Sequence, residues 1–232
     1  MSGLEAIGAA SSIASLFNTA IECFKYIRVA KSFGDRYQSA LLDLDSAQLR
    51  LSRWGDAVHL SGGGVTNSSR LPRTLANSTE RELAERMLKH IIHLFDVART
   101  KADQIDKRQH RSTAVADEED SEDDEEPDHG FLAIRGYIRR IVEKRQNRAS
   151  VREMTKWVIY NEGEFTALIA DIKRHTDDLI NGFPALEEQN TKLCKSEVGE
   201  FTMTLQSLAI AAQNQDELLA DQLSKMLQPV VR

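Results

Sequence analysis

Two histidines and an aspartate, His90, His93 and Asp96, first point to chemistry, because positions three apart share one face of a helix. Imidazole and carboxylate groups bind zinc, but a zinc site needs three or four such ligands, and the sequence offers no others. An ordinary polar helix face is the better interpretation. The chain also lacks a P-loop, a nucleophile elbow and a CxxC pair, and the Gly62–Gly64 run lacks the lysine of a phosphate-binding loop. We predict a protein that is not an enzyme and has no metal or cofactor.

A run of ten carboxylates lies between Asp117 and Asp128, with no basic residue among them. It lacks the glycine turn and the spaced oxygen ligands of a calcium-binding EF-hand loop. Ten like charges do not share a packed surface, so the composition predicts a solvated, disordered loop over residues 110–129. Because the net charge of the whole chain is −6, the remainder carries +4 and is mildly basic.

Cations gather directly after this acidic run, seven of them within eighteen residues and with Glu143 as the one opposing charge. They are Arg135, Arg139, Arg140, Lys144, Arg145, Arg148 and Arg152. One interpretation is that the acidic loop simply screens them. Another is that all but Arg152 bind anionic lipid headgroups, each contributing about 1 kcal/mol. Nucleic acid is not predicted as a partner, because Tyr137 is the only interleaved aromatic residue and no recognition motif is present.

The composition favours a reduced, intracellular protein built of long helices. Of the 232 residues 41% are apolar, while Gly at 12 and Pro at 4 leave few turns. Two distant cysteines, Cys23 and Cys194, make no disulfide framework. The first basic residue is Lys25, so the charged start of a signal peptide is missing. We therefore expect a cytoplasmic location.

Apolar residues at helical spacing predict an all-α fold, a single globular domain of six to eight helices and no strands. The second helix is expected to begin at an Asp35 N-cap, and the third at a capping box made by Thr79 and Glu82. Gly182 should end a later helix. The predicted helices cover residues 3–30, 35–60, 79–108, 131–146, 150–160, 165–181, 186–212 and 215–226.

The N-terminal helix is unusual because no charge interrupts Ala6–Ile21, and its second face is small rather than charged. As helix, these 16 residues extend about 24 Å, against a hydrocarbon core of about 30 Å. Apolar transfer of about −2 to −4 kcal/mol is opposed to a similar extent by Glu5, Glu22, Asn18 and the serines. The free energy of transferring this helix into lipid is thus close to zero, so it suits both the core of a soluble fold and a membrane. Its candidate membrane-inserting face is Leu4, Ile7, Ile13, Leu16, Phe17, Ile21 and Phe24.

Several segments resemble the HeLo domain, the N-terminal domain of the fungal HET-s/HET-S heterokaryon-incompatibility family. The specific ones are SLFNTAIECFKYI (15–27), SFGDRY (32–37) and LSRWGDAV (51–58), and looser ones are LAERMLKHIIHLFDVA (83–98), TKWVIYNEG (155–163) and NGFP (181–184). The resemblance spans nearly the whole chain and implies an all-α, often dimeric executor of cell death. In that family a C-terminal prion-forming segment is templated into amyloid, which expels the N-terminal helix into membranes.

On this resemblance we expect a HeLo-like domain over residues 1–228 with a tail at 229–232, cytoplasmic at rest and at the cell membrane on activation. Glu22 would be a charge that insertion must bury, pair or carry, and Ser32 and His90 fall at positions resembling those that separate toxic from inert members. Expected partners are a second copy of the chain, membrane lipids, and an amyloid-forming or NLR-type trigger. The alternative is a non-toxic dimerisation or regulatory module that does not insert.

Overall fold

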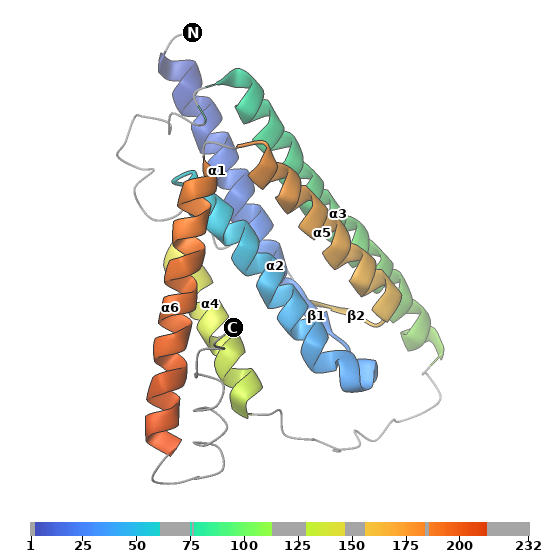
Figure 1. Ribbon diagram of the computed structural model, residues 1–232. Helices are drawn as coiled ribbons and strands as arrows, with labels where there is room; N and C mark the ends of the chain where they lie inside the picture. Colours follow the sequence, from blue (N-terminus) through green and yellow to red (C-terminus); the bar gives the residue numbers. More distant parts are fainter. Residues whose placement is uncertain are drawn as a thin grey trace. The chain divides into compact units, whose positions relative to one another are not determined.

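The computed structural model describes residues 3–60, 75, 77–112, 129–146, 156–183 and 186–212. Within these residues it contains six α-helices, one 3-10 helix and two short strands (Figure 1). In chain order they are α1 (Gly3–Tyr26), β1 (Ile27–Val29), η1 (Lys31–Arg36), α2 (Tyr37–Ala57), α3 (Ser78–Ser112), α4 (His129–Arg145), β2 (Trp157–Ile159), α5 (Glu162–Asn181) and α6 (Glu187–Ala212).

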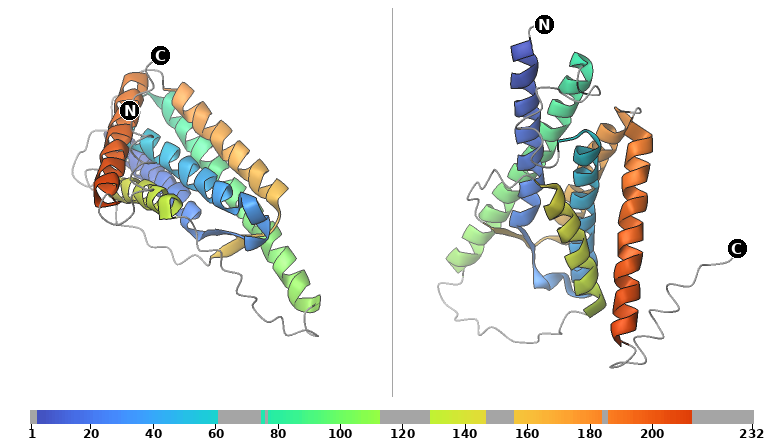
Figure 2. Two further views of the ribbon diagram at one scale, coloured as in Figure 1. Left: turned by 60° about the horizontal axis from the view of Figure 1, so that its bottom comes forward. Right: turned by 90° about the vertical axis from the view of Figure 1, so that its left-hand side faces the viewer.

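Four helices close into a ring, because α1 packs on α3, α3 on α5, α5 on α2, and α2 on α1. The apolar stripes of these helices meet inside the ring, where Leu51, Trp54, Leu88, Ile91 and Ile172 are fully buried. Helix α4 lies along α2, as both views of Figure 2 show. The all-α prediction is confirmed by this architecture.

The two strands contradict the prediction that no strand is present. β1 and β2 form a parallel pair in which Ile27 lies opposite Trp157 and Val29 opposite Ile159. The N–H of Ala30 extends the pairing by donating to the carbonyl of Ile159 at 3.0 Å. Three residues are too few for a recognisable alternation, and the partner is supplied from a distant part of the chain. The helix predicted to reach residue 30 therefore ends at Tyr26, and residues 157–159 are strand rather than helix.

The turn from β1 into α2 runs through η1, where Gly34 has a φ of 53°. Glycine adopts this left-handed conformation without the steric cost of a Cβ atom. Residues 31–36 form the 3-10 helix η1, so α2 begins only at Tyr37, with Arg36 as its N-cap. The predicted Asp35 N-cap is therefore wrong.

Side-chain caps fix the starts of two helices. The carboxamide oxygen of Asn77 accepts from the N–H of Thr79 at 3.0 Å, so α3 begins before the predicted Thr79–Glu82 capping box. The oxygen of Asn161 accepts from the N–H of Glu164 at 2.9 Å and starts α5 three residues earlier than expected. The predicted helix stop at Gly182 is confirmed, since this residue is the C-cap of α5.

The remaining predictions fall partly outside the described residues. Residues 110–112 are helical rather than loop, while 113–128, 147–155 and 213–232 are not described, so the acidic run and the helix predicted for 215–226 lie there. The chain groups into two compact units, Met1–Glu187 and Glu188–Arg232. α6, of 26 residues, lies almost entirely in the second unit. The domain bounds of 1–228 stay a prediction.

Candidate functional site: the seat of helix α1

Four of the seven residues on the face of α1 that was predicted to enter membranes lie in the protein core. Ile13, Phe17, Ile21 and Phe24 are each at most 3% exposed, whereas Leu16 is half-buried. Leu4 and Ile7 belong to the helix, but their side chains lie outside the described part of the structure. Small residues complete the buried face, since Ala14, Ala20 and Cys23 are also buried.

Phe17 packs against a glycine and an aromatic pair on the other side of the core. A Cβ atom at Gly55 would come within 2.1 Å of the Phe17 ring, so the backbone of α2 approaches α1 as closely as glycine allows. The Phe17 ring lies 6.2 Å from Trp54, and Trp54 lies 5.9 Å from Phe183, which follows α5. These contacts link α1, α2 and the end of α5.

Two further contacts hold the C-terminal half of α1. The Phe24 ring meets Phe95 of α3 edge-on, with ring centroids 4.9 Å apart. The buried side chain of Gln48, on α2, donates from Nε2 to the carbonyl of Ile21 at 3.1 Å. We call the residues that receive α1, namely Gln48, Trp54, Gly55 and Phe95, the α1 seat.

The α1 seat stabilises the helix by an amount comparable to the stability of a whole domain. Burying a large apolar side chain contributes about 1.5–3 kcal/mol, so Ile13, Phe17, Ile21 and Phe24 together contribute about 6–12 kcal/mol. The free energy of unfolding of a domain is typically about 5–15 kcal/mol. Removal of α1 therefore cannot be a local opening of an otherwise intact fold.

Cys23 lies on the buried side of α1, 6% exposed. Its burial, together with the carboxylates of Asp96 and Glu22, raises the pKa of its thiol to about 12. Because the thiolate is the reactive form, this cysteine is chemically inert while α1 stays in place.

The three residues predicted to be regulatory occupy separate elements. Glu22 is half-buried on α1, Ser32 is exposed in η1, and His90 is exposed on α3. His90 has a partner that sequence reasoning missed, because its ring lies 5.2 Å from that of His175 on α5. Burial lowers the pKa of His175, and the charges of Arg174 and His90 act in the same direction.

The cations of α4 divide into an inner and an outer group. Nε of Arg135 lies 2.6 Å from the buried carboxylate of Asp45, and Nε of Arg145 lies 3.3 Å from the half-buried carboxylate of Asp56, so both are held by α2. Arg139 is half-exposed and lies 3.6 Å from Asp45. Of the other predicted headgroup residues, Arg140 and Lys144 are exposed, and Arg148 is not described.

The residues missed by sequence reasoning are those whose role depends on a distant partner. Gly55 carries the one available signal, a glycine beside Trp54 inside a predicted helix, where glycine otherwise costs stability. Nothing in the local sequence marks Gln48 or His175.

Neither a membrane span nor a metal cluster is present in the described residues. None of the helices described is both long and apolar enough to cross a bilayer. In the same residues, His, Cys, Asp and Glu side chains form no group of three with the geometry to hold a metal ion.

The sequence of this chain is similar to those of known proteins. A sequence model of the HeLo family, described as prion-inhibition and propagation, matches residues 5–210. Heterokaryon incompatibility protein s of Podospora anserina is 28% identical over 229 residues, which cover 97% of this chain and 75% of that protein. Heterokaryon incompatibility protein S of Podospora anserina strain S is 27% identical over 231 residues, covering 98% and 75%.

Solved structures agree with these matches. The HET-s N-terminal domain has a TM-score of 0.68 and 26% identity, covering 92% of this chain and 95% of the other. A double mutant of that domain gives a TM-score of 0.66 and 27% identity, covering 92% and 97%. None of the matched names denotes an enzyme, in agreement with the prediction from sequence.

Proposed function

We propose that this chain, which belongs to the HeLo family of prion-inhibition and propagation proteins, executes incompatibility-type cell death by releasing α1 from its seat into a membrane. The observation that carries this proposal is the position of the lipid-compatible face, since Ile13, Phe17, Ile21 and Phe24 are all sealed in the core. An apolar helix hidden in this way is harmless until the fold around it is disrupted.

The energetics of the α1 seat support a trigger that acts on the whole fold. Because the buried side chains contribute about 6–12 kcal/mol, spontaneous release is negligible under resting conditions. A segment that assembles outside the domain would supply the missing free energy by straining it. The matched relatives are a third longer than this chain's match, which leaves room for such a segment in those proteins.

In the same proposal the exposed cations of α4 bring the protein to the membrane. Arg139, Arg140 and Lys144 are exposed on α4, where an anionic leaflet attracts them by about 1 kcal/mol each. Glu22 enters the interface with α1 and stays at headgroup depth. The protein is cytoplasmic at rest, pairs with a second copy of itself, and moves to the cell membrane on activation.

A second candidate is a regulatory HeLo module that never inserts. The observation in its favour is that Arg135 and Arg145 are committed to carboxylates of α2, which reduces the charge available to lipid. In this case α1 is only a structural core helix, and charges placed on it destabilise the fold without a separate effect on membranes.

Dye leakage from anionic liposomes tests the proposal. The chain is fused at its C-terminus to a segment that forces assembly, and the unfused chain and a deletant of residues 1–24 are measured alongside. Leakage from the fusion alone supports conditional permeabilisation by α1. Equal leakage from the deletant, or silence of an assembled fusion, contradicts it and favours the regulatory module.

A pair of lysine variants separates loss of insertion from loss of folding. Leu16→Lys places a charge on the predicted inserting face at a half-buried position, where the lysine stem still reaches solvent. Ser15→Lys adds the same charge at the neighbouring exposed position. With circular dichroism unchanged in both fusions, we expect leakage to fall for Leu16→Lys and to persist for Ser15→Lys.

A further inference from the structure

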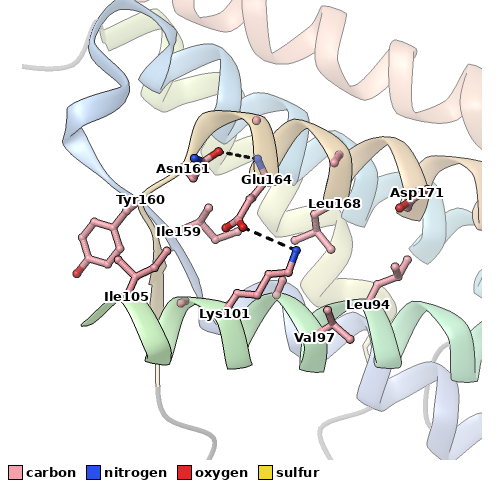
Figure 3. Close-up of a pocket in the computed structure, with 14 residues that line it drawn as sticks. Leu94, Val97, Lys101, Ile105, Ile159, Tyr160, Asn161, Glu164, Leu168 and Asp171 are labelled. Atoms are coloured by element: carbon pink, nitrogen blue, oxygen red, sulfur yellow. Dashed lines mark hydrogen bonds and ion pairs between the residues drawn. The ribbon is translucent and has the colours of Figure 1, made fainter. Parts of the chain in front are cut away.

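A cavity of about 370 Å³ lies between α3 and the first turns of α5, beside the end of β2 (Figure 3). This volume is within the range of about 300–1,000 Å³ that is usual for small-molecule sites. Its walls are mostly apolar, with Leu94, Val97, Ala98, Ala102 and Ile105 on one side and Ile159, Ala167 and Leu168 on the other.

Two large apolar side chains in this lining are left open to solvent. Val97 is 40% exposed and Tyr160 is 36% exposed, and in the described part of Met1–Glu187 only Leu132 joins them as an exposed large apolar residue. Both line the same apolar cavity, and apolar surface that is exposed together and rimmed by polar residues is typical of a binding site. A ligand with an apolar body would cover both.

The charges in the lining favour a cationic ligand. Among the described lining residues Lys101 is the one cation, and it lies 3.7 Å from Glu164, which it neutralises. The second carboxylate, Asp171, lies two turns further along α5, about 10 Å from Glu164, at the end of the cavity near Leu94 (Figure 3). Its partner, Arg174, lies 2.9 Å away on the same helix, outside the lining, and is 65% exposed. The described lining of the opposite wall places no second cation beside Asp171.

We infer that this cavity binds a small amphiphile with one ammonium group, placed at Asp171, and an apolar or aromatic body that extends over Ala167 and Val97 toward Tyr160. Small side chains leave the room for this body, because Ala98, Ala102 and Ala167 line its path. The two carboxylates and single ammonium of the lining disfavour an anionic ligand of the same shape.

A ligand in this cavity would also make the release of α1 from its seat less favourable. This consequence, unlike the binding itself, rests on the proposed function. Ile159 lines the cavity and is paired with Val29, three residues beyond Tyr26 at the end of α1. Leu94 precedes Phe95, on which Phe24 packs. A ligand that binds only the folded state raises its stability by mass action, and with it the barrier to release.

Three probes of one shape test the inference on the folded protein without membranes, so the result does not depend on whether α1 ever inserts. 4-Phenylbutylamine is cationic, 4-phenylbutanol is neutral and 4-phenylbutyrate is anionic. We expect the amine to bind with a dissociation constant of about 1 mM or tighter by calorimetry. At tenfold excess over that constant it should raise Tm by about 3–6 °C.

Matched variants locate the binding. Ala167→Phe fills the cavity from an exposed lining position and should abolish binding, whereas Ala170→Phe, exposed on the same helix but outside the lining, should not. Asp171→Asn should weaken the amine about two- to fivefold and leave the alcohol unchanged. Three results would overturn the inference. They are a lack of both heat and Tm shift with 4-phenylbutylamine, binding of 4-phenylbutyrate as tight as that of the amine, and binding of the amine to Ala167→Phe as tight as to the parent.

Discussion

The ring of Phe17 rests on Gly55 so closely that no other residue fits at that position of α2 unless the ring shifts. The contact couples the packing of two helices at a single backbone site. It also makes the α1 seat testable by the addition of one methyl group.

We expect Gly55→Ala to lower the free energy of unfolding by about 1–3 kcal/mol, because the new Cβ overlaps a ring that has no room to retreat. This loss outweighs the gain in helix propensity of about 1 kcal/mol. Urea unfolding measures the change. In the assembling fusion the same variant should increase liposome leakage, because the seat holds α1 less tightly.

Gly136→Ala is the matched control, since nothing lies within 4 Å of a Cβ atom at this helical glycine of α4. It should be neutral or stabilising by up to about 1 kcal/mol. Equal stability losses in the two variants would contradict the close contact between Phe17 and Gly55.

The second prediction concerns the buried ion pair between α2 and α4. Asp45 is 3% exposed and holds Arg135, whose side chain is 13% exposed. Asp45→Ala leaves that guanidinium without its carboxylate in the interior, and we expect a loss of about 3–5 kcal/mol in urea unfolding. Glu85→Ala removes the exposed pair with Lys89 on α3 and should cost less than about 0.5 kcal/mol.

Thiol labelling provides a direct reporter of α1. Because burial raises the pKa of Cys23 to about 12, a Cys194→Ser variant that retains only Cys23 should react negligibly with a thiol reagent near pH 8 while folded. On assembly of the fused segment, labelling of Cys23 should rise with leakage. Rapid labelling of the resting protein would show that α1 is not sealed in the core.

The fourth prediction is a loss of stability on acidification through His175. Its pKa in the folded state is lowered, chiefly by burial, so between that value and the unfolded value of about 6.5 the unfolded state binds more protons. Stability is therefore full above pH 6.5 and falls as the pH drops toward the folded pKa. His90 on α3 and Arg174 add to the repulsion, while Asp171 and Asp178 oppose it.

Thermal unfolding from about pH 7.5 to about pH 5.5 should show this fall in the parent and a shallower one in His175→Gln. His93→Gln is the control, because it removes an imidazole from an exposed position on α3. If both variants follow the parent, protonation of His175 does not limit stability.

Sequence reasoning succeeded where one segment carries its own pattern. Ile13, Phe17, Ile21 and Phe24, four residues of the apolar face predicted for α1, are buried, because apolar positions at helical spacing report burial locally. It failed where two distant segments determine the outcome. In the sequence, nothing distinguishes one cation of α4 from another. In the structure, carboxylates of α2 bind Arg135 and Arg145, while Arg140 remains exposed.

The same limit explains the missed strands and the histidine pair. Ile27–Val29 is apolar, charged, apolar, which fits the end of a helix as well as a strand, and only the presence of Trp157–Ile159 decides the matter. His90 and His175 are 85 positions apart and share no periodic pattern.

The parallel pairing of β1 with β2 determines when this sheet can form during synthesis of the chain. Ile27 leaves the ribosome 130 residues before its partner Trp157, an interval of about 7–26 s at ordinary rates of translation. Throughout that time the sheet that anchors the end of α1 cannot exist, and Phe95 of the α1 seat is itself synthesised 68 residues after Ile27. The nascent chain thus passes through a period in which its most lipid-compatible segment is only partly enclosed, and in that interval we expect it to depend on chaperones.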